Sequence, residues 1–108
     1  MNKRAPRYYF HIKKESFYYN PNTISMIKKD VGSAWLFEIL LNLSINTRGI
    51  LNFDIEQFSD LSLVFNEEEV LDILELLEYY EFIRIVRSEG LLYINNHHEY
   101  VGIQKKGS

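Results

Sequence analysis

The clearest helical pattern in the chain lies between Asn66 and Tyr80. Apolar side chains recur there at the spacing of one helix face: Val70, Ile73, Leu74, Leu77 and Tyr80. Asn66 is followed three residues later by Glu69, which is the capping-box pattern of a helix start. We therefore expect a helix over residues 67–80, with this apolar face turned to the core.

A second capping pattern precedes this helix. Asp54 is followed by Gln57, which predicts a helix that begins at Asp54. The apolar residues of this helix share one face: Ile55, Phe58 and Leu61. Residues 62–65 would then connect two adjacent, separately capped helices.

The segment from Ser33 to Asn46 is apolar on nearly every side. Only Glu38, Asn42 and Asn46 form a polar stripe. We expect Ser33 to cap a helix that runs to about Asn46 through the centre of the core, because a helix apolar all round is normally buried.

Shorter elements surround this helix. Residues 8–13 are rich in aromatics and predict a short strand. Asn20-Pro21-Asn22 predicts a turn, followed by a short helix from Thr23 to Lys29 that ends near Gly32. Residues 46–49 predict a turn before a very short strand over residues 50–53.

The last predicted element is a β-hairpin. Its strands, residues 82–87 and 91–94, are separated by Ser88-Glu89-Gly90, and Gly90 suits the left-handed position of a three-residue loop.

In order, these elements predict an α+β domain that is mainly α. It would be a winged helix-turn-helix with an added N-terminal strand and helix, in which the two capped helices form the helix-turn-helix and the hairpin is the wing. We expect a flexible basic arm over residues 1–7, the domain over residues 8–103 and a tail over residues 104–108.

Composition fits this prediction. The chain has 108 residues, 46% hydrophobic and 25% charged, as in one ordinary globular domain. The absence of cysteine fits a reducing compartment, and no apolar run reaches the length of a membrane span. We expect a cytoplasmic protein with no membrane contact.

Charge is strongly segregated along the sequence. Ten of the fifteen Asp and Glu residues lie within residues 54–81, which contain no Lys, Arg or His, so this segment has a net charge of −10. The rest of the chain combines twelve Lys and Arg with five carboxylates, a net charge of +7. Such asymmetry predicts opposite poles with different partners.

The outward face of the helix predicted over residues 67–80 is a candidate protein-binding surface. It combines carboxylates with two larger side chains: Glu68, Leu71, Asp72, Glu75, Glu78 and Tyr79. An apolar centre within a charged rim is typical of a protein interface, although single exposed apolar residues also occur on ordinary solvated helices. Because carboxylates repel phosphate, we expect this face to bind protein rather than to enter a DNA groove.

The basic residues are the candidates for DNA contact. They lie in the N-terminal third and on the predicted hairpin strands: Lys3, Arg4, Arg7, Lys13, Lys14, Lys28, Lys29, Arg84 and Arg87. Aromatic residues are interleaved with the N-terminal cations: Tyr8, Tyr9, Phe17, Tyr18 and Tyr19. Such rings can stack single-stranded bases while cations hold phosphates, but a strand buries half of its side chains, so several of them would instead be core residues.

No catalytic or metal site can be assembled from the sequence. The glycines are isolated, so there is no phosphate-binding loop, and the three histidines combine with no Ser and Asp into a nucleophile arrangement. We place His97 and His98 in an extended surface tail, where adjacent side chains point to opposite sides and cannot easily share one ion. We expect a protein that is not an enzyme and that uses no cofactor or metal.

Five segments carry a resemblance to a known family: Tyr9-Phe10-His11-Ile12-Lys13-Lys14 with Phe17, the apolar helix over residues 34–41, Gly49-Ile50-Leu51, Tyr80-Glu81-Phe82-Ile83, and residues 93–102. Over residues 8–103 the chain resembles the N-terminal domain of phage replisome organiser proteins, relatives of the winged-helix domain of DnaD-type primosomal proteins. The resemblance implies a part in starting phage or mobile-element DNA replication. Proteins of this kind bind an origin or its single-stranded region and recruit the host helicase-loading machinery.

Three functions compete on these grounds. The first is a replication-initiation domain that contacts DNA through the basic arm and wing, and a primosomal protein, a host protein or a second copy through the acidic helix. The second is a small phage-encoded inhibitor whose acidic face imitates DNA and occupies a host defence or replication enzyme. The third, a transcriptional repressor, is disfavoured by the acidic helix. Salt-dependent DNA binding would separate the first function from the second.

Overall fold

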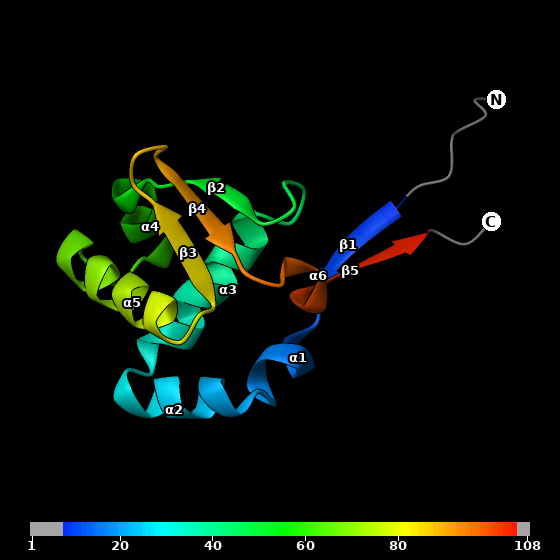
Figure 1. Cartoon of the computed structure of the whole chain (residues 1–108), viewed down its shortest axis with the longest axis horizontal. Coiled ribbons are helices and arrows are strands. Elements are labelled where there is room, and N and C mark those ends of the chain that lie inside the picture. Colours follow the sequence, from blue (N-terminus) through cyan, green and yellow to red (C-terminus); the bar gives the residue numbers. More distant parts are fainter. Residues whose placement is uncertain (1–7, 106–108) are drawn as a thin grey trace.

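The computed structural model describes residues 8–105, which form an α+β fold that is mainly helical (Figure 1). Its elements follow one another along the chain: β1 (Tyr8–Ile12), α1 (Lys14–Tyr18), α2 (Pro21–Lys29), α3 (Gly32–Leu43), β2 (Ile50–Asn52), α4 (Ile55–Ser62), α5 (Glu67–Tyr79), β3 (Ile83–Val86), β4 (Leu91–Ile94), α6 (His97–Tyr100) and β5 (Val101–Lys105). The predicted basic arm, residues 1–7, lies outside the described residues.

Helix α3 is the centre of the core, as its apolar sequence predicts. Leu36, Phe37 and Leu40 are fully buried. The helix packs against α2, α4 and α5, and the three-stranded antiparallel sheet lies beside these helices in the order β2-β4-β3 (Figure 1).

Helices α4 and α5 begin where their capping patterns predict. The Asn66 side chain accepts a hydrogen bond from the Glu69 amide at 2.8 Å, and the Glu69 carboxylate accepts one from the Asn66 amide at 3.0 Å. In α4, the Asp54 carboxylate accepts a hydrogen bond from the Gln57 amide at 3.1 Å. These bonds satisfy backbone donors that the first turn of a helix leaves free.

The hairpin is confirmed with a small change of bounds. Strand β3 ends at Val86, so Arg87 joins the turn, and Gly90 takes the left-handed conformation with φ of 65°. Val86 pairs with Leu91 and Ile83 with Ile94.

Two predictions near the start of the chain were wrong. Residues 20–22 are not a free turn: Asn20 caps α2, its side chain accepts a hydrogen bond from the Asn22 amide at 2.9 Å, and Pro21 is the first helical residue. The fixed φ of proline suits that position. Ser33 does not cap α3, which begins one residue earlier, and its hydroxyl instead donates to the Asp30 carbonyl at 2.6 Å.

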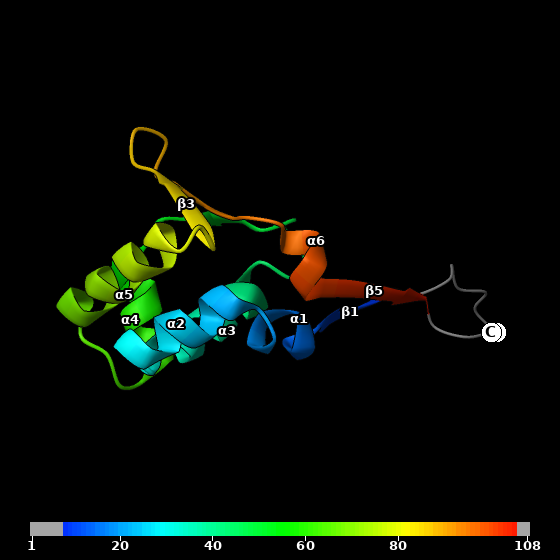
Figure 2. The ribbon, with the colours of Figure 1, turned by 60° about the horizontal axis from the view of Figure 1, so that its bottom comes forward.

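The ends of the chain form more structure than the sequence pattern indicates. Helix α1 was not predicted, and β5, which includes the start of the expected tail at residues 104–105, pairs antiparallel with β1. Two views show this two-stranded ribbon projecting from the body (Figures 1 and 2). It accounts for the elongated shape, which measures 52 × 29 × 26 Å.

An aromatic cluster fixes both end segments to the core. Phe17 of α1 stacks on Phe37 of α3, with ring centroids 4.7 Å apart, and Phe37 meets Tyr100 of α6 edge-on at 5.4 Å. Phe82 contacts Phe17 at 5.4 Å. Such ring pairs stabilise beyond their buried area, so α1 and α6 belong to the domain.

Candidate interaction surfaces

The outward face of α5 is largely as predicted. Glu68, Asp72 and Glu75 are exposed, Leu71 lies among them, and the ring of Tyr79 is 73% exposed. Helix α4 also carries exposed carboxylates, and Asp54, Glu56 and Asp60 line a shallow depression there. Carboxylates therefore cover two consecutive helices.

Glu78 has a different role from its neighbours on this face. One of its carboxylate oxygens accepts a hydrogen bond from the Ile85 amide at 3.1 Å, and the side chain is half-buried. It joins α5 to β3, so a partner protein has only part of this carboxylate to contact.

Lys29 is not separated from the acidic helix. Its ammonium lies 5.5 Å from the Tyr79 ring centroid and 5.6 Å from that of Tyr80. A depression between α2 and α5 is lined by Lys29, Asp72, Glu75 and Tyr79. The end of the basic N-terminal segment thus adjoins the acidic face. At this point the basic and acidic residues do not lie at opposite poles of the molecule, as the sequence suggests.

The two arginines of the hairpin each lie over an aromatic ring. The Arg84 guanidinium carbon is 4.5 Å from the Tyr93 centroid, and that of Arg87 is 5.2 Å from the Phe53 centroid. Arg84 pairs with Tyr93 across the β3–β4 ladder, so both side chains leave the same face of the sheet. Stacking occupies the flat face of a guanidinium and leaves its N–H edge available to an anion.

The other predicted DNA-contacting residues are not gathered at one place. Lys28 and Lys29 lie at the end of α2, whereas exposed Lys13 precedes α1 and its amide donates to the Tyr100 carbonyl at 2.7 Å. Lys14 begins α1. Lys3, Arg4 and Arg7 lie outside the described residues. The structure therefore gives the hairpin arginines the best-defined geometry of the predicted set.

An exposed apolar surface, which we call the α4–α5 corner, was missed by the sequence analysis. It comprises exposed side chains from the end of α4, the α4–α5 turn and the start of α3: Val31, Trp35, Leu61, Leu63 and Val64. The Trp35 indole donates to the Ser62 carbonyl at 3.1 Å. The ring of Phe65 lies against Gly32, where a β-carbon would be 2.5 Å from it. These two contacts bring the turn against α3.

Leu63 is the most unusual residue of this corner. It is 86% exposed, and its backbone is left-handed with φ of 67°. This conformation at the end of a helix normally belongs to glycine, because a side chain there is strained. Packing among the described residues therefore does not explain a large apolar side chain at this strained position.

The sequence contains one signal for this corner. Leu61-Ser62-Leu63-Val64-Phe65 is more apolar than a helix connector needs, and no glycine stands at the end of α4. We expected Leu61 on the core face, but it is 44% exposed.

His97 and His98 were placed wrongly in an extended tail. They lie in α6, where His98 is exposed and His97 is partly buried. Burial and the neighbouring His98 hold the pKa of His97 below its ordinary value of 6.5, against the opposing effect of a hydrogen bond to the Ser44 backbone. Within residues 8–105, no three or more His, Asp or Glu side chains come together as a metal site.

No helix in the part of the chain that the structure describes has the length and apolar character needed to cross a bilayer. No protein-family model, curated protein or solved structure matches the chain.

Proposed function

We propose that the chain is a winged-helix domain of a phage or mobile-element replication-initiation protein of the replisome organiser type. Three features support the winged-helix assignment. The order α3-β2-α4-α5-β3-β4 is that of the fold, α4 and α5 are adjacent capped helices, and β2 pairs with the β3–β4 hairpin. The five segments that resemble replisome organiser domains support the same assignment. We place the protein in the cytoplasm, where replication proteins act.

The domain is a non-enzymatic adaptor that binds a protein partner with the α4–α5 unit. The observation that carries this proposal is Leu63, which is strained, exposed and surrounded by other exposed apolar side chains in a segment of net charge −10. An apolar centre with a charged rim suits a partner surface that is apolar with a basic rim. A primosomal protein, a host protein and a second copy of the chain are the candidate partners.

DNA contact is proposed for the hairpin, not for α5. A helix with Glu68, Asp72 and Glu75 on its outward face would meet repulsion from phosphates. Arg84 and Arg87 are exposed and oriented by the rings beneath them.

The test is the binding of fluorescent single- and double-stranded oligonucleotides over a range of salt concentrations. We expect the affinity to fall steeply with salt, and Arg84→Gln to lower the slope of log K against log salt by about 1. Arg48→Gln removes the same charge from the turn before β2, at the other edge of the sheet, and should leave the slope nearly unchanged. If the two variants change the slope equally, the proposed DNA contact through Arg84 is contradicted.

A second function is favoured by one observation. Carboxylates on both α4 and α5 form an acidic surface without any Lys, Arg or His from that segment, as a protein that imitates DNA would have. An inhibitor of this kind would show no DNA affinity at low salt. Instead it would bind a nucleic-acid enzyme with a basic channel, and charge reversal at Glu68, Asp72 and Glu75 would abolish that binding.

A further inference from the structure

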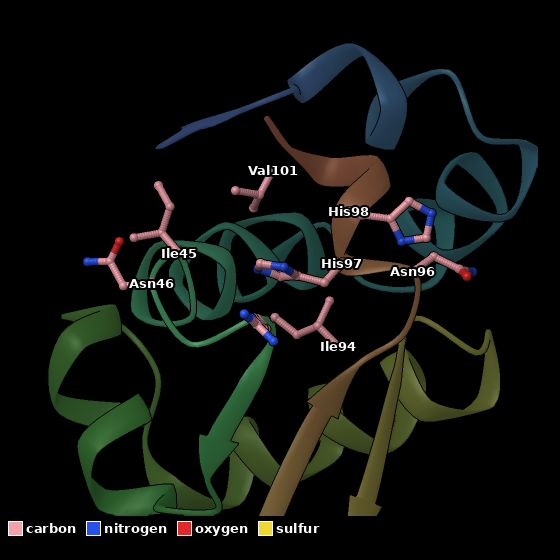
Figure 3. Close-up of a pocket in the computed structure, with 8 residues that line it drawn as sticks. Ile45, Asn46, Ile94, Asn96, His97, His98 and Val101 are labelled. Carbon is pink, nitrogen blue, oxygen red and sulfur yellow. The ribbon is translucent and has the colours of Figure 1, made fainter. Parts of the chain in front are cut away.

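A cavity of about 690 Å³ lies between the end of α3, strand β4 and helix α6 (Figure 3). Its walls combine apolar side chains from the turn after α3, from β4 and from β5, namely Ile45, Ile94 and Val101, with the polar groups of Arg48 and His97. This volume is in the range that holds small organic ligands, and an apolar wall with few polar groups is typical of such sites.

His97 has an unsatisfied polar atom at this cavity. Its Nε2 is buried and has no hydrogen-bond partner among the described residues. Buried polar atoms are nearly always hydrogen-bonded in native proteins, so an exception calls for an explanation. Nε2 has almost no accessible surface, so a ligand would supply the missing partner only after the imidazole ring turns toward the cavity.

Two residues that line the cavity have left-handed backbone: Arg48 with φ of 56° and Asn96 with φ of 54°. Gly49, next to Arg48, has φ of 82°, which glycine adopts without strain. A β-carbon at Gly49 would lie 2.8 Å from the β-carbon of His97, so only glycine allows this turn to approach the histidine. Strain that gathers from two loops at one cavity is typical of a binding site.

The charge of the lining selects the chemistry of the ligand. Arg48 contributes a guanidinium cation, and among the residues that the structure describes, those lining the cavity include no carboxylate. A guanidinium matches the geometry of a carboxylate or phosphate group, and Nε2 donates to the same group once it is protonated. We propose that the cavity binds a small organic anion whose carboxylate or phosphate meets Arg48 and His97, and whose apolar or aromatic body packs on Ile45, Ile94 and Val101.

This proposal is independent of the proposed function, and its test uses three probes that share one ring. Phenyl phosphate and benzoate carry the two candidate anionic groups, and benzyl alcohol is their neutral analogue. Each is titrated into the isotope-labelled protein while the side-chain nitrogen resonances of the histidines are followed by NMR. We expect at least one anion to shift the His97 resonances at millimolar concentration, and at least tenfold weaker binding of benzyl alcohol. The stronger anion identifies the preferred group.

Variants decide whether the named residues form the site. Arg48→Gly relieves the positive φ while it removes the guanidinium, and we expect it to remain folded and to bind at least tenfold more weakly. We expect the same loss for His97→Gln. Arg87→Gly is the matched control, because it removes the same charge from the hairpin turn and Arg87 is not among the residues that line the cavity, and it should change the affinity by less than about twofold.

Lower pH should tighten anion binding, because Nε2 must gain a proton to donate. The other charged or titratable side chains among the described lining residues are Arg48 and His98. Equal binding of benzyl alcohol and the anions would overturn the proposal, and so would anion affinity that survives Arg48→Gly.

Discussion

Replacing Leu63 by glycine should make the protein more stable. A side chain in the left-handed conformation costs about 1–2 kcal/mol, whereas glycine loses about 0.5–1 kcal/mol more backbone entropy on folding. Leu63 is 86% exposed, so little buried area is lost. The hydrogen bond from its amide to the Asp60 carbonyl, at 3.3 Å, does not depend on the side chain. We therefore expect Leu63→Gly to raise the free energy of unfolding by about 0.5–1 kcal/mol.

The assay is urea denaturation with thermal melting as a second measurement. For a domain of this size the expected gain corresponds to roughly 2–8 °C in Tm. Leu63→Ala is the matched control, because alanine removes the exposed side chain but keeps the β-carbon and its strain. If Leu63→Gly is no more stable than Leu63→Ala, the argument that Leu63 is kept for binding at a cost in stability is refuted.

Three further predictions concern stability. Glu78→Ala should lower the free energy of unfolding by about 1–2 kcal/mol, because the Ile85 amide of β3 then loses its hydrogen-bond acceptor. Glu75→Ala should change the free energy of unfolding by less than about 0.5 kcal/mol. The depressed pKa of His97 means that the unfolded chain binds more protons below pH 6.5, so stability should fall as the pH drops through this region. Urea titrations should show this loss in His98→Gln but not in His97→Gln. Gly49→Ala should cost about 1–3 kcal/mol, since its φ of 82° is strained for alanine and its β-carbon would meet His97.

Each of these has an outcome that contradicts it. Equal destabilisation by the Glu75 and Glu78 variants would show that the bond to β3 contributes nothing. If His97→Gln keeps the pH dependence of stability, other groups cause that dependence. If Gly49→Ala leaves the free energy of unfolding unchanged, the turn can shift to accommodate the new β-carbon without a cost.

Local rules were enough to predict the α4–α5 unit and the hairpin. A capping box, a helical apolar stripe and a glycine at a turn act over a few residues, and each is confirmed: the Asn66–Glu69 pair, the buried face of α5 and the positive φ of Gly90.

Contacts between distant parts of the chain were not predictable in this way. Strand β5 exists because it pairs with β1 at the other end of the sequence, and α1 lacks a capping side chain and is fixed by Phe17 in the aromatic cluster. No local pattern encodes either pairing. The short helix α6 likewise depends on a contact with a distant part of the chain, that of Tyr100 with Phe37. The sequence pattern did not predict this helix, so His97 and His98 were assigned to a tail.

The candidate surfaces were only partly predictable for a related reason. Helical spacing placed Glu68, Asp72 and Glu75 on an exposed face, but apolar spacing alone cannot tell a core contact from an exposed one. Leu61 fits the core stripe of α4 and yet is exposed, and the strain at Leu63 depends on a backbone angle that no sequence pattern states.

The most direct test of the account is to map DNA binding onto the protein by NMR. Backbone amide resonances of the labelled chain are followed while an oligonucleotide is added at low salt. The account predicts shifts at Arg84, Arg87 and their hairpin neighbours, and none on the outward face of α5. Shifts concentrated at Glu68, Asp72 and Glu75, with the hairpin unchanged, would contradict it.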